Sequence, residues 1–136
     1  VAYSVFAEDK KMTVATDIGH ITDTIKENVY ESDVLLLEAN HDIEMLKNGS
    51  YPWPLKKRIL GDKGHLSNVA AGETLSELMS GKTKFAFLGH LSNENNEPHL
   101  AYETVEKILE KNGVKVGTYF KLDMAARYSN SLAVEM

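Results

Sequence analysis

The chain has 136 residues, and its 15 basic and 20 acidic side chains give a formal net charge of −5 at pH 7. That length suits one ordinary domain, and 43% hydrophobic with 26% charged residues is the composition of a soluble globular protein. The absence of cysteine excludes disulfide frameworks, thiolate zinc sites and cysteine nucleophiles, and the longest apolar run, at residues 34–37, is far too short to span a bilayer.

The charge balance bears on nucleic-acid binding. An acidic chain without a block of Lys and Arg is not a strongly electrostatic nucleic-acid-binding domain. A nuclease stays compatible with this balance, because bound metal cations can supply the positive charge that a phosphate needs. The first residues show no signal peptide, so we expect a cytoplasmic protein.

The first third of the chain predicts a hairpin, a helix and a buried strand. Residues 1–7 alternate and are rich in Val, Tyr and Phe, and after a polar turn residues 12–16 predict the partner strand. Ile21, Ile25 and Val29 recur every four residues, which predicts a short amphipathic helix. The continuous apolar run at residues 34–37 is typical of a strand buried on both faces.

Helices and strands alternate in the remainder. We predict helices at residues 41–47, 54–60 and 67–79, a strand at residues 84–88 and a last strand at residues 114–122. Between these strands Asn96 is the predicted N-cap of a helix with Pro98 in its first turn, and the helix should end at Asn112-Gly113. A hairpin followed by alternating strands and helices predicts an α/β fold with α+β layering.

Polar residues follow the ends of the predicted strands, where α/β folds place their functional sites. Asp17, Glu38 and His90 each end a strand, while His65 precedes one helix and His41 begins another. Without cysteine, carboxylates and imidazoles are the ligands expected for zinc or a similar divalent ion. The same residues are compatible with structural roles, as turn or cap residues and as buried histidines.

Six short strings occur in order along the chain. They are residues 15–19 (ATDIG), 38–42 (EANHD) with 45–46 (ML), 51–53 (YPW), 58–60 (RIL), 64–68 (GHLSN), and 88–92 (LGHLS) with 94–96 (ENN). Together, and over nearly all of the chain up to about residue 123, they resemble the C-terminal half of the metallo-β-lactamase-fold hydrolases, in a bacterial cytoplasmic branch.

The resemblance implies a four-layer αββα sandwich that holds two divalent metal ions, zinc or manganese, between its sheet edges. By this resemblance Asp17 bridges the two metals and His90 is the last ligand of the second one. His65 resembles the histidine that contacts the scissile phosphate or the leaving group. Glu38 and His41 match residues that line the same cleft, as groups that support the ligands or transfer protons.

One part of the family pattern does not occur in this sequence. The main ligand motif, His-x-His-x-Asp-His, is absent, and so is a further histidine expected before the Asp17 string. Two ligands cannot hold two metals, because each ion needs about four donors. We therefore expect residues 1–136 to be half of a domain, to bind few or no metal ions alone, and to pair with the missing half or to self-associate.

For the complete domain the resemblance implies phosphodiester hydrolysis of nucleic acid, as in a DNA exonuclease. One alternative is a hydrolase of small esters, thioesters or lactams at the same metal site. Another is a truncated, non-catalytic fragment that only binds a partner, which the missing motif favours for this chain alone. A last alternative is an unrelated α/β protein in which the histidines are structural.

Overall fold

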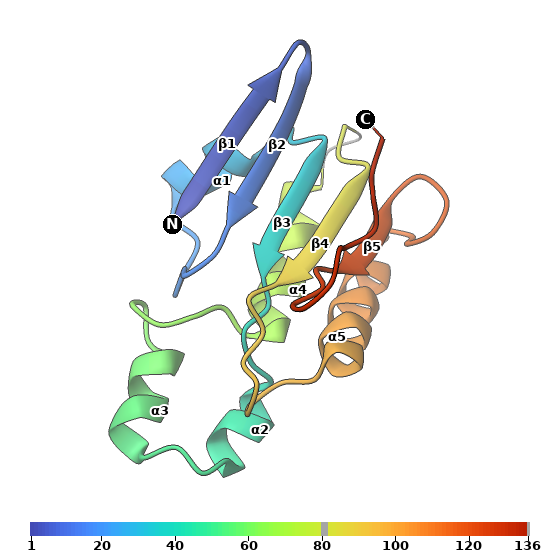
Figure 1. Cartoon of the computed structure of the whole chain (residues 1–136). Helices are drawn as coiled ribbons and strands as arrows, with labels where there is room; N and C mark the ends of the chain where they lie inside the picture. Colours follow the sequence, from blue (N-terminus) through green and yellow to red (C-terminus); the bar gives the residue numbers. More distant parts are fainter. Residues whose placement is uncertain (80–81, 136) are drawn as a thin grey trace.

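The computed structural model describes residues 1–79 and 82–135 (Figure 1). In chain order its elements are β1 (Ala2–Ala7), β2 (Lys10–Ala15), α1 (Asp23–Val29), β3 (Val34–Glu38), α2 (Ile43–Asn48), α3 (Trp53–Leu60), α4 (Asn68–Leu78), β4 (Phe85–Gly89), α5 (Pro98–Lys111) and β5 (Lys121–Met124). Of the helices in these ranges, none is long and apolar enough to cross a membrane.

The strands form one sheet in the order β1-β2-β3-β4-β5. β1 runs antiparallel to β2, as the predicted hairpin requires, and the other neighbours are parallel. In this register Ala15 pairs with Leu37 and Leu37 with Leu88, so β2, β3 and β4 end at the same edge. Polar residues that follow these strands are therefore brought together at the carboxyl edge of the sheet.

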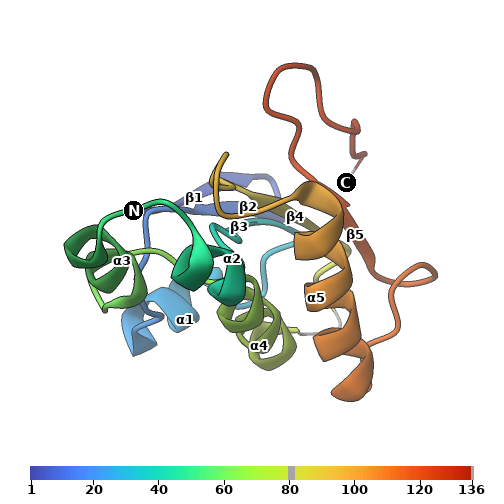
Figure 2. The ribbon, with the colours of Figure 1, turned by 90° about the horizontal axis from the view of Figure 1, so that it is seen from below.

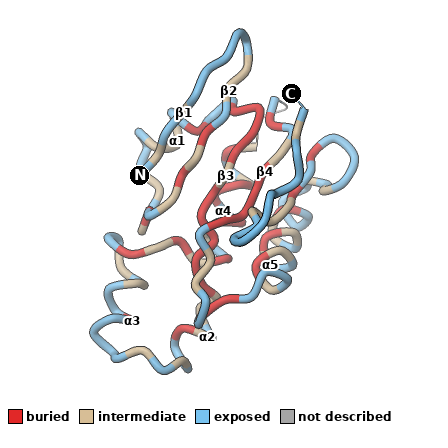
Figure 3. The backbone as a smooth tube through the Cα atoms, in the orientation of Figure 1, coloured by how far each residue is buried: buried red, intermediate tan, exposed pale blue. Residues whose placement is uncertain are grey.

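Helices α1, α4 and α5 cover one face of the sheet (Figure 2). Leu37 and Leu88 are fully buried and belong to one core cluster with Leu75 of α4 and Val105 of α5. Most of β3 and β4 is buried (Figure 3). Complete burial of side chains of this size contributes about 1.5–3 kcal/mol each. Gly72 lets the two helices approach, because a Cβ there would lie 2.9 Å from Cδ1 of Ile108. The core is therefore built on one side of the sheet.

The opposite face of the sheet is also apolar. Val14, Leu36 and Phe87 lie side by side in the register of β2, β3 and β4, and they alternate with the residues that face the helices. At the edge of this sheet β1 exposes Tyr3 and Val5, with 67% and 64% of their surface accessible. A layer of this kind is expected to be covered by another structure.

Most of the predicted elements are confirmed, and with them the layered α/β fold class. The last strand is an exception, because it comprises only Lys121–Met124. A hydrogen bond from the Val114 N–H to the Leu109 carbonyl closes the end of α5. The chain then turns at Gly117, where φ is +119°. Left-handed backbone at this glycine breaks the extended pattern that the sequence predicted.

The predicted N-cap of α5 is wrong as well. Glu97 occupies that position, and its side chain makes no capping hydrogen bond. The Asn96 side chain is buried and exchanges amide hydrogen bonds of 2.8 and 2.9 Å with Asn68 of α4, while it also donates to the Ala39 carbonyl. These tertiary bonds satisfy the Asn96 amide in place of the cap.

Candidate metal centre

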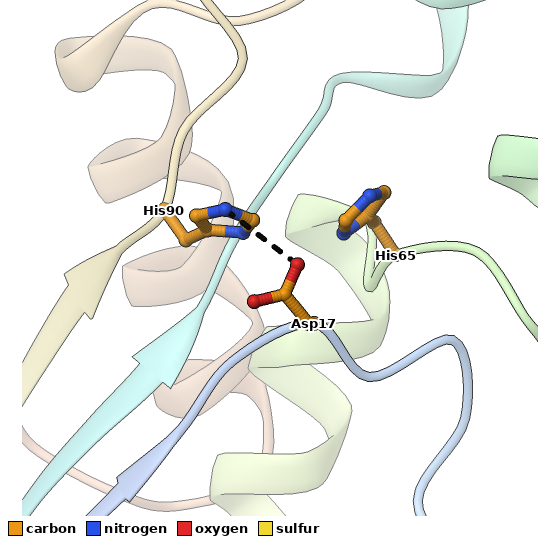
Figure 4. A group of neighbouring side chains, drawn as sticks. All are labelled: Asp17, His65 and His90. Atoms are coloured by element: carbon orange, nitrogen blue, oxygen red, sulfur yellow. Dashed lines mark ion pairs between the residues drawn. The ribbon is translucent and has the colours of Figure 1, made fainter. Parts of the chain in front are cut away.

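Three potential metal ligands meet at the carboxyl edge of the sheet. Asp17 follows β2, His90 follows β4 directly, and His65 lies in the loop before α4. One carboxylate oxygen and one nitrogen of each imidazole lie within 4.8 Å of one another (Figure 4). Oδ1 of Asp17 lies 3.8 Å from Nε2 of His90. This donor set, one oxygen and two imidazole nitrogens, suits zinc or a similar divalent ion.

The Glu38 carboxylate holds both imidazoles from behind. Glu38 ends β3 and is fully buried, and its Oε1 lies 2.7 Å from Nδ1 of His65 and 2.6 Å from Nδ1 of His90. An ionised carboxylate has only acceptors, so both imidazoles donate to it through Nδ1–H, and Nε2 is the ring nitrogen that is left for a metal. Histidine ligands in metalloproteins are commonly oriented in this way: one ring nitrogen donates to a carboxylate, and the other faces the metal.

The second oxygen of Glu38 ties two loops together. Oε2 accepts a hydrogen bond of 3.0 Å from the N–H of Ile18 and one of 3.5 Å from the N–H of Leu66. The buried carboxylate thus receives donors from the loops that carry Asp17, His65 and His90. These hydrogen bonds offset the cost of burying the Glu38 charge, which would be several kcal/mol without partners.

Two of the three candidate ligands have unusual backbone geometry. Asp17 and His90 have φ values of +56° and +54°, in the left-handed region that residues with a side chain rarely adopt. Such a residue costs of order 1–3 kcal/mol, and it persists only where the surrounding structure fixes it. Gly19 helps here, because a Cβ at this position would collide with the carbonyl oxygen of Asp62. The loop after β2 therefore packs directly on the loop before α4.

His41 lies behind the site and not on its surface. Its side chain is 1% exposed, and within the described residues neither ring nitrogen has a hydrogen-bond partner. Burial, with a smaller effect from the neighbouring His65, lowers the pKa of His41 to about 4, so this imidazole is neutral at pH 7. The backbone carbonyl of His41 accepts from the N–H of Asn68 and so helps to fix the start of α4.

Asn40 is a site residue that the sequence pattern did not single out. Its side-chain amide donates to the His90 carbonyl at 2.9 Å, and its backbone N–H donates to the Leu66 carbonyl at 2.8 Å. Asn40 therefore joins the loop of His90 to the loop of His65. In the sequence Asn40 is marked only by its place in the string at residues 38–42, two residues beyond Glu38 at a strand end. Asparagine is common at such positions in loops, so its presence there does not indicate a site.

A cleft of about 570 Å³ is lined by both imidazoles, of which His90 is exposed and His65 is half-buried. Asn40, His65 and His90 form its floor together with residues from α3 and from the loop after β4, and the basic side chains Arg58 and Lys63 lie on its α3 side. The volume is in the usual range of ligand-binding sites. The two candidate histidine ligands are thus accessible to a substrate.

No family model matches the chain, but relatives are found among known proteins. Over 120 residues, or 88% of this chain, it is 42% identical to exodeoxyribonuclease WalJ of Streptococcus pneumoniae. It is 37% identical to exodeoxyribonuclease YycJ of Bacillus anthracis over the same length. The aligned segment covers 45% of WalJ and 46% of YycJ, so the chain spans slightly less than half the length of the curated relatives it matches.

Among solved structures, the chain is similar to the metallo-beta-lactamase fold protein YhfI of Bacillus subtilis. The TM-score is 0.57 with 14% sequence identity, over 91% of this chain and 40% of YhfI. At that identity the similarity concerns the fold alone. The similarity to YhfI shows that the chain has part of the metallo-β-lactamase fold, and its sequence makes it a relative of WalJ and YycJ.

Proposed function

We propose that this chain carries part of the active site of a metal-dependent phosphodiesterase that acts on DNA. The observation that supports this most is the convergence of Asp17, His65 and His90 around one point, with Glu38 bonded to both imidazoles. The exodeoxyribonuclease names of the relatives WalJ and YycJ favour DNA as the substrate.

The donor set fits a divalent cation, zinc or manganese, and a pair of such ions in the complete domain. Asp17 and His90 would hold the metal, and when bound the metal supplies Lewis-acid activation of water and of the phosphodiester. Glu38 keeps the His90 ring oriented, and the same carboxylate holds His65 at the mouth of the cleft. There the His65 imidazole can stabilise charge on the phosphate or on the leaving oxygen.

The remaining metal ligands would come from a part of the domain outside this chain. Asp17 and His90 supply two side chains, and even with His65 the candidate donors number three, whereas two ions need about four donors each. The apolar outer face of the sheet and the exposed edge strand β1 would be covered by that same part. We propose that residues 1–136 form about half of the catalytic domain, and that alone they bind metal weakly and have no catalytic activity.

Substitution of Asp17 with Ala should weaken metal binding by the chain about tenfold or more, because it removes the only carboxylate of the donor set. Titration calorimetry with Zn²⁺ and with Mn²⁺ measures this. His99→Ala is the control, since this exposed imidazole pairs only with Glu97. An Asp17→Ala chain with unchanged affinity would contradict the assignment.

Glu38→Gln tests the residue that orients the ligands. The amide keeps the size of the side chain but loses the charge and one acceptor, so metal affinity should fall about 10–100-fold. Glu94→Gln is a matched control, because Glu94 also lines the cleft but contacts neither imidazole. Thermal unfolding of both variants separates lost orientation from lost folding. Equal metal affinity in the two variants would show that Glu38 does not position the histidines.

The reaction itself requires the longer polypeptide that supplies the His-x-His-x-Asp-His motif. In that protein we expect metal-dependent hydrolysis of end-labelled DNA, and Asp17→Ala should abolish it. Ester, thioester and lactam substrates are run in parallel with the same enzyme. Turnover of one of these substrates without cleavage of DNA would overturn the proposal and identify the small-molecule alternative.

The chain alone should self-associate through its uncovered sheet. Tyr3 and Val5 lie on the exposed strand β1, so Val5→Lys should shift the chain toward monomer in analytical ultracentrifugation. Tyr119→Lys is the control, because Tyr119 is 85% exposed and lies outside this strand. If the unsubstituted chain sediments as a monomer at every concentration, the sheet does not need a covering partner.

A further inference from the structure

Two basic side chains on one side of the cleft have no partner of their own. Arg58 lies in α3 and Lys63 in the loop that leads to His65, and both are exposed and line the cleft. Within residues 1–79 and 82–135, neither side chain makes a hydrogen bond or an ion pair. Two unpaired cations beside the candidate metal ligands suit an anion that reaches the same cleft.

The other charged residues of the cleft are already engaged. The Arg127 guanidinium donates to Oδ1 of Asn93 and to the Leu91 carbonyl, so it fastens the segment after β5 to the loop after β4. Glu94 accepts a hydrogen bond of 3.4 Å from the Ser50 hydroxyl. Arg127 keeps its charge, but its N–H groups are used by these bonds. Among the described residues, the cations of the cleft without a protein partner are thus Arg58 and Lys63, on its α3 side.

We propose that Arg58 and Lys63 bind the phosphates of a single DNA strand beside the phosphodiester held at Asp17 and His90. This inference rests on the proposed function and names its substrate subsite. The ring of Tyr51, which also lines the cleft, offers a surface on which a base of that strand stacks.

The net charge of the chain makes this local arrangement necessary. At −5 the molecule as a whole repels DNA, so binding depends on the few cations that face the substrate. Each phosphate contact with a single strand contributes about 0.7 to the slope of log affinity against log salt concentration. The contribution of Arg58 and Lys63 is therefore measurable separately from any chemistry at the metal ligands.

The test measures binding of a fluorescein-labelled, single-stranded oligodeoxynucleotide to the 136-residue chain, by anisotropy in EDTA at low salt. The double variant Arg58→Gln/Lys63→Gln should lose about tenfold in affinity, and its salt slope should fall by about 0.7 per lost contact. Lys57→Gln/Lys115→Gln is the matched control, because it removes the same charge from exposed positions that do not line the cleft. Its affinity should change much less.

Equal losses in the two double variants would overturn the proposal, because the effect would then follow net charge alone. The absence of binding by the unsubstituted chain would overturn it too, as would full displacement of the strand by inorganic phosphate at the same phosphate concentration. EDTA removes divalent ions from the assay. The DNA-binding result therefore does not depend on whether the chain acts as a metal-dependent enzyme. Likewise, loss of DNA binding in the Arg58 and Lys63 variant would not change the metal titrations.

Discussion

The buried carboxylate of Glu38 is the interaction on which the site depends. It ends the central strand β3, where no water reaches it, and it accepts hydrogen bonds from two imidazoles and two backbone N–H groups. A buried charge of this kind is tolerated only while its partners stay in place. The loops after β2 and β4 and the loop before α4 are consequently all bonded to this one side chain, and Asn40 adds a second link between the loops of His65 and His90. Any change that moves one loop leaves Glu38 short of a donor, so the three loops act as one unit.

This anchoring explains how the strained backbone at Asp17 and His90 persists. Left-handed φ values at two residues with side chains cost of order 1–3 kcal/mol each, which is large beside the net stability of a small domain. The adjacent Ile18 N–H and the His90 ring both bond to Glu38, so the surrounding contacts fix these conformations. The left-handed backbone orients the two side chains. Because of it, Asp17 and His90 point toward a common position and do not continue along the strands. Two of the four described non-glycine residues with left-handed backbone are thus candidate metal ligands.

The sequence alone predicted much of the fold and the right neighbourhood for the site. The apolar run at residues 34–37 and the four-residue spacing of Ile21, Ile25 and Val29 are local signals, and each corresponds to an element of the structure. Strand ends in a parallel sheet share an edge, so the proximity of Asp17, Glu38 and His90 could be predicted as well. The two-sided hydrogen bonding of Glu38 could not be predicted, because it depends on loop conformations that no periodicity encodes. The same holds for Asn96, whose local pattern indicated a cap but whose amide bonds to Asn68 in the core.

The proposed shortage of metal ligands and the apolar outer face of the sheet have a common physical origin. The candidate ligands all follow strand ends or lie beside them at one edge of the sheet, so they can surround a metal ion from one side only. The face that bears Val14, Leu36 and Phe87 ends at that same edge, so a second layer packed on this face would bring its own loops to the candidate ligands. Burial of the apolar face would then supply the free energy that holds the two sets of ligands together. In such an arrangement assembly of the core and completion of the metal site are one event, and ligand geometry is fixed by the packing of the two layers.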